Sequence, residues 1–140
     1  MMTKRLLLLL VPVLAIACGS SPSTPSSTGT TTPITESFEV TLAPGDTAFY
    51  SFSQSSAASV TVTLTSLVRP GRAAAVAAPL TIGLGTPAGE GCTVTDSAEV
   101  TPALTSQLAT TMGAGVHCIS VTDAGQLADA VIASIRFTHQ

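Results

Sequence analysis

Two cysteines and two histidines could together bind a metal or form a nucleophilic pair, namely Cys92, His117, Cys118 and His139. Thiolates and imidazoles are metal ligands, and a cysteine beside a histidine can act as a nucleophile. Adjacent strand residues point to opposite faces, so His117 and Cys118 are poorly placed to share one ion or one substrate. We therefore predict no catalytic residues, no metal ligands and no cofactor.

A disulfide is the expected role of Cys92 and Cys118, because the start of the chain predicts export and an exported protein keeps paired cysteines oxidised. The bridge would close a loop of about 26 residues and stabilise the fold by about 3–4 kcal/mol in the chain-entropy description. An oxidised Cys118 could not act as a nucleophile. A small hydrolase is thus the least favoured function, although carboxylates that meet only in the folded chain remain an alternative.

The charged residues argue against a nucleic-acid partner, and the aromatic residues give little support to glycan binding. Beyond residue 17 the chain has three basic residues, all arginines, against eight acidic ones, a net charge of about −5. Nucleic-acid binding needs clustered Lys and Arg, so no nucleic-acid partner is expected. Glycan binding usually uses exposed aromatic rings, and this chain has no Trp. Phe49 alone alternates out of phase with Ala48, Tyr50 and Phe52, which makes it the candidate exposed binding residue.

The first residues have the three parts of a secretory signal peptide. Lys4 and Arg5 precede an apolar run at residues 6–16, and residues 15–17 form a small-x-small cleavage site before Cys18. The run is too short to span a bilayer, which takes about 20 apolar residues. This arrangement resembles a bacterial lipobox, so we predict a lipoprotein signal peptide at 1–17 and acylation (palmitate-type chains) of Cys18. The alternative is ordinary secretory cleavage that leaves a soluble protein with a free thiol.

Membrane lipid, bound through acylated Cys18, is therefore the first predicted partner, because several acyl chains make a stable anchor. Gly19 after the cysteine resembles an outer-membrane address in Gram-negative bacteria. Residues 19–35 contain eleven Ser or Thr, three Pro and no charged residue. Such a composition cannot bury enough apolar surface to fold, so we expect 18–35 to be a tether.

The remaining residues, 36–140, alternate apolar and polar side chains as half-buried strands do. The clearest case is the alternation of Val60, Val62 and Leu64 with threonines. Similar segments lie at about 38–42, 48–52, 80–84, 92–98, 104–111, 117–121 and 131–137. The Ala-rich segment 72–78 lies between Pro70-Gly71 and Pro79, which favours a loop. About eight strands with turns between them predict an all-β fold with one antiparallel sandwich, a barrel being the alternative.

Three segments carry a family resemblance: Leu-Ala-Pro-Gly-Asp at 42–46 with the aromatic strand ending at Phe52, Leu-Thr-Ile-Gly-Leu at 80–84, and residues 114–121. Together they resemble the bacterial pre-peptidase C-terminal domain over roughly residues 37–139. The resemblance implies a jelly-roll or immunoglobulin-like β-sandwich that serves as a non-catalytic accessory or binding module. It adds to the prediction of a lipid-anchored envelope protein with a protein partner. Binding of a glycan or a divalent ion is the alternative function.

Overall fold

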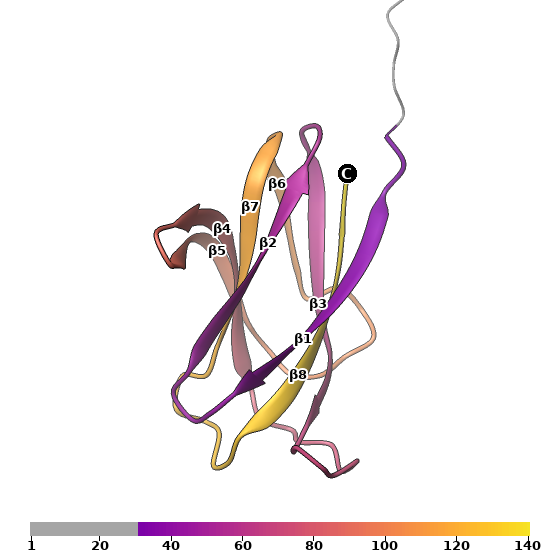
Figure 1. The fold of residues 1–140 in the computed structure, drawn as a ribbon. Helices are drawn as coiled ribbons and strands as arrows, with labels where there is room; N and C mark the ends of the chain where they lie inside the picture. Colours follow the sequence, from indigo (N-terminus) through magenta and orange to yellow (C-terminus); the bar gives the residue numbers. More distant parts are fainter. Residues whose placement is uncertain (1–30) are drawn as a thin grey trace, which may run out of the picture.

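Two antiparallel sheets of four strands each make up the folded part of the chain (Figure 1). The computed structural model describes residues 31–140. The predicted signal peptide at 1–17, the acylation site Cys18 and most of the predicted tether lie outside the described residues. Within 31–140, no helix is long and apolar enough to cross a bilayer.

The strand order is that of an eight-strand jelly roll, in which the chain passes repeatedly from one sheet to the other. One sheet has the order β1-β8-β3-β6 and the other the order β2-β7-β4-β5. The predicted all-β sandwich is thereby confirmed. The strands are β1 (Ile34–Leu42), β2 (Thr47–Gln54), β3 (Ala58–Val68), β4 (Leu80–Ala88), β5 (Gly91–Val100), β6 (Leu108–Met112), β7 (Gly115–Thr122) and β8 (Val131–His139).

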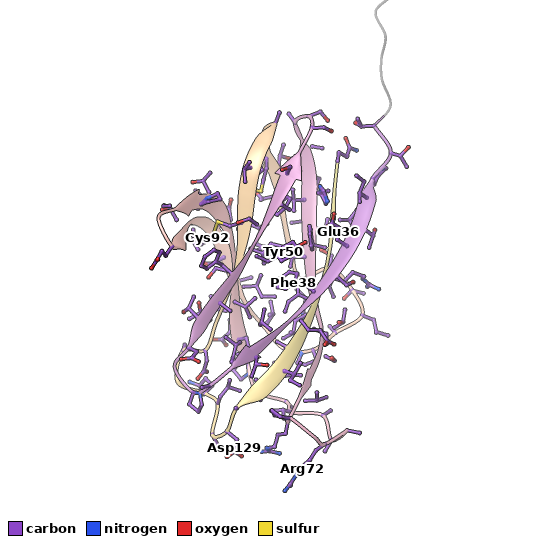
Figure 2. All side chains as sticks on the ribbon, viewed as in Figure 1. Glu36, Phe38, Tyr50, Arg72, Cys92 and Asp129 are labelled. Atoms are coloured by element: carbon purple, nitrogen blue, oxygen red, sulfur yellow. A yellow bond between two sulfur atoms is a disulfide. The ribbon has the colours of Figure 1, made fainter. Side chains whose placement is uncertain are left out.

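The core lies between the two sheets and consists of the apolar side chains predicted from the period-two pattern. Val60, Val62 and Leu64 of β3 are fully buried. Phe38 of β1 stacks on Tyr50 of β2 with ring centroids 4.5 Å apart, which closes one open side of the sandwich (Figure 2). Aromatic pairs of this kind contribute about 0.5–1.5 kcal/mol beyond the area they bury.

A bulge in β3 changes which residues face the core. The pairing with β8 shifts register between Leu64 and Ser66, and Thr65 Oγ1 donates to the carbonyl oxygen of Ser134 at 2.9 Å. Because a bulge inserts one residue, the inward positions move from even to odd numbers. Leu67 is consequently buried with 1% exposure, whereas strict alternation from Leu64 would have placed Ser66 inward.

Several strand boundaries differ from the sequence prediction: β4, predicted at 80–84, continues to Ala88, and two strands start elsewhere than expected. β1 begins at Ile34, inside the predicted tether, because residues 34 and 35 already pair with β8 and the hydroxyls of Thr35 and Thr138 lie 3.0 Å apart. β6 begins at Leu108 rather than near 104. The residues before it bond to β3 irregularly: Gln107 Oε1 accepts from Leu64 N at 2.8 Å, and Gln107 N donates to Val62 O at 3.0 Å.

The strand directions separate the connections into two groups. Connections 43–46, 69–79 and 123–130 lie at one end of the sandwich, which we call the loop end. The short connections 55–57, 89–90 and 113–114 lie at the other end, together with the start of β1 and the C-terminus (Figure 1). We call this second end the terminal end. There Ser55 N donates to Gln140 O at 2.8 Å.

Candidate functional site

A cavity of about 240 Å³ lies at the loop end, between connections 69–79 and 123–130. Its floor is apolar and includes Leu127 and Val131, which are 7% and 1% exposed. Its polar lining consists of Arg69, Gln126 and Asp129. A concave surface that combines apolar side chains with a few polar groups is typical of binding sites, so this cavity is the candidate functional site.

Connection 69–79 is held against β3 and forms no helix, as the flanking prolines predict. A turn closes through Arg72 N, which donates to Arg69 O at 3.0 Å, and Gly71 in it has a φ of 71°. Only glycine adopts that left-handed conformation at little cost. Farther along, Val76 N donates to Leu67 O at 2.8 Å. These bonds place one wall of the cavity, with Arg69 in its lining.

Connection 123–130 is organised by the carboxylate of Asp123, which is 3% exposed. Asp123 Oδ1 accepts from Gln126 N at 2.8 Å and from Leu127 N at 3.2 Å, and its Oδ2 accepts from Gly45 N at 2.8 Å. Burial by itself would raise the pKa of Asp123. The backbone N–H groups of Gly45, Gln126, Leu127 and Gly125 outweigh burial and hold that pKa below its usual range.

The substitution Asp123→Asn should lower the melting temperature by several degrees at neutral pH, because the amide nitrogen replaces one of the accepting oxygens. A carboxyl with a lowered folded-state pKa stabilises fully above its unfolded pKa of about 3.9 and loses this effect as pH falls through the folded value. The difference in melting temperature between wild type and variant should therefore disappear in acid.

Thermal unfolding at a series of pH values measures this difference. Glu90→Gln, at an exposed turn residue, is the control, and parallel curves for Asp123→Asn would contradict the role assigned here.

The rim of the cavity carries an ion pair that the sequence pattern did not indicate. Arg69 Nε lies 3.2 Å from Asp129 Oδ2, and these side chains are 42% and 65% exposed. A more open depression of about 610 Å³ adjoins the cavity and is lined by Arg69, Arg72 and Asp129 among others. Arg72 and Asp129 both lie at the loop end (Figure 2). Two of the three arginines of residues 31–140 thus line the same depression. The Pro-Gly turn between them was the available signal.

Phe49, the candidate exposed binding residue, is 43% exposed and lies away from the cavity lining. It pairs with Ser120 of β7 on the outer face of the β2-β7-β4-β5 sheet. Val94 and Val116 are also partly exposed, at 42% and 57%. The predicted outward direction of Phe49 is therefore confirmed, and its role in binding stays a prediction.

Cys92 and Cys118 form a disulfide, with their Cα atoms 5.9 Å apart. The bridge joins β5 to β7, although β4 lies between these strands in the sheet. This disulfide is the one that the sequence predicted, and it is confirmed.

The two histidines lie on the inner side of the sandwich, separated from the disulfide by the sheet. His117 is 8% exposed and its Nε2 lies 2.8 Å from Gly113 O, and His139 is 4% exposed with Nε2 3.4 Å from Glu36 Oε1. The ring of Phe52 contacts both imidazoles. In the part of the chain that the structure describes, no three His, Cys, Asp or Glu side chains come together as a metal site requires.

Glu36 also accepts from the hydroxyl of Tyr50 at 3.3 Å. Burial, and then the charge and hydrogen bond of Glu36, raise the pKa of Tyr50. These polar groups close the terminal end of the core and do not line the cavity.

No family model matches the chain, and no curated protein matches it either.

Proposed function

We propose that this protein is a non-catalytic interaction module held at the bacterial cell envelope by an acylated Cys18. The sequence of residues 1–18 supports the anchor, and the position of β1 supports the way in which the module is presented. β1 starts at the terminal end, opposite the cavity. A tether that enters there leaves the loop end facing away from the membrane, and this observation carries the proposal.

Binding is favoured over catalysis by the chemistry of the cavity. Its polar lining, Arg69, Gln126 and Asp129, can hold a charged or hydrogen-bonding group. The described lining residues include no hydroxyl, thiol or imidazole that could form a nucleophile–base pair. We propose a protein partner, because the cavity adjoins a wider depression that can cover more of a chain.

The intact mass of the mature protein, extracted from its native membrane, tests the anchor. We expect a chain that begins at Cys18, carries ester-linked and amide-linked acyl groups, and gains two hydrogens when the disulfide is reduced. Mild alkaline hydrolysis is the control, because it removes only the ester-linked chains. An unacylated chain from Cys18, or a chain that retains residues 1–17, would contradict the proposal.

A further inference from the structure

The loop-end cavity has an apolar floor and one arginine in its lining, and a second arginine lies in the depression that adjoins it. Val76 and Ala78 from one connection and Leu127 from the other are packed against the core and line the cavity. Arg69 belongs to both the cavity and the adjoining depression, and Arg72 lines the depression. A ligand that contacts both the apolar floor and the two arginines therefore has an anionic group next to an apolar one.

Both arginines keep donors available for such an anion. Asp129 engages only Nε of Arg69, and a guanidinium has five N–H donors in all. Within residues 31–140 the Arg72 side chain takes part in no ion pair. By contrast, Arg136 donates through Nη2 to the carbonyl oxygen of Leu104, elsewhere on the molecule. The nearby Asp123 carboxylate is occupied by backbone N–H groups, so it does not compete for the arginines.

The size of the cavity restricts what enters it. Sites that enclose a whole small molecule measure about 300–1,000 Å³, and this cavity is smaller, at about 240 Å³. It therefore suits the end of a ligand. The depression of about 610 Å³ beyond Arg69 can cover the part of the ligand that precedes this end.

We propose that the cavity binds the free C-terminal carboxylate of a partner protein whose last side chain is apolar. Arginine recognises carboxylates through paired, charge-assisted hydrogen bonds, and the last side chain would lie on the floor formed by Val76, Leu127 and Val131. Asp129 disfavours more highly charged anions such as phosphate through like-charge repulsion. The assignment rests on the proposed function, since it names the partner chemistry of the same module.

A comparison of free-acid and amidated peptides tests the assignment. The full mature protein, purified in detergent and immobilised, is exposed to a pool of acetylated pentapeptides with a randomised last residue, and to the same pool as C-terminal amides. We expect free acids that end in an apolar residue to be enriched at least about tenfold over their amides. Arg69→Gln and Arg72→Gln should each weaken binding several-fold. Arg136→Gln makes the same charge change away from the cavity and should leave binding unchanged.

Equal retention of acids and amides, no retention above background, or undiminished retention by the Arg69→Gln/Arg72→Gln double variant would overturn the assignment. Competition by butanoate as strong as that of the peptides, mole for mole, would also overturn it and indicate a small-molecule site. The melting temperature of each variant establishes that lost binding is not lost folding.

Photo-crosslinking in cells separates this assignment from the proposed function. A crosslinking residue replaces Ala128 at the loop end or, as the matched control, Ala57 at the terminal end; both are exposed alanines. Adducts with one protein at position 128 and none at 57, together with no preference for free-acid peptides, would overturn the carboxylate assignment and keep the proposed function. Peptide binding without adducts at either position would support the site and contradict the envelope partner.

Discussion

Loss of the Cys92–Cys118 disulfide, in the variant Cys92→Ala/Cys118→Ala, should lower the free energy of unfolding by about 3.5 kcal/mol. The bridge closes a loop of 26 residues, and loop-closure entropy of the unfolded chain gives this magnitude. Alanine is the better replacement at position 118, because Cys118 is fully buried and a serine hydroxyl there would lose its hydrogen bonds to water. Urea unfolding with and without a thiol-free reductant measures the effect.

The comparison with reductant isolates the bridge from the packing of the sulfur atoms. Reduced wild type and the double variant should unfold at similar urea concentrations, and reductant should not change the variant. Because the bridge ties the tip of the β4–β5 hairpin, at Cys92, to β7, its release should loosen this hairpin first. A loss below about 1 kcal/mol would mean that the unfolded chain is already compact there, contrary to the entropic argument.

The substitution Gly85→Ala should destabilise the protein by about 3 kcal/mol, at the upper end of the usual cost of overpacking. An added Cβ would overlap the carbonyl oxygen of Thr93 and would lie 2.7 Å from the carbonyl carbon of Thr93 and 2.9 Å from Cα of Val94. These are backbone atoms of β5, which cannot rotate away as a side chain can. β5 must then move from β4, and the disulfide moves with it.

Urea unfolding and titration of free thiols in the purified protein measure the two effects together. We expect Gly85→Ala to have a lower midpoint and a larger fraction of unpaired Cys92 and Cys118. Gly83→Ala should cost less, because its Cβ would meet only the methyl groups of Val94. Gly113→Ala has open space and a negative φ, so it should stay within about 0.5 kcal/mol of wild type. Equal effects at 85 and 113 would refute the close-approach argument.

The tight approach at Gly85 depends on a bulge that the sequence did not reveal. β4 and β5 shift register between Leu84 and Gly85, and Thr95 Oγ1 donates to Leu84 O at 3.1 Å. The bulge sharpens the local twist, and the hairpin bends toward its tip (Figure 1). In this bent hairpin Cys92 of β5 reaches Cys118 of β7. Counting cysteines predicted the bond, but the curvature that makes it possible depends on pairing between strands.

The predictable part of the fold was local, and the unpredicted part depended on long-range pairing. Alternation along Val60, Val62 and Leu64 is a property of one strand, and all three are buried as expected. The meeting of Arg69 with Asp129, 60 residues later, follows from the strand order that places β8 beside β3. Alternation indicates which side chains share a face, but it does not specify which strands become neighbours.

The pairing of β1 with β8 determines how the sandwich responds to a pulling force. The two strands pair over nine residues, from Ile34 with His139 to Leu42 with Val131. A load between Ile34 and His139, which pair at the terminal end, would unzip these pairs one after another. A load between Ile34 and the loop end runs along the strands, so the hydrogen bonds, which lie across that direction, are sheared together. The module should therefore resist tension along its long axis far better than tension that peels β1 from the edge of the sheet.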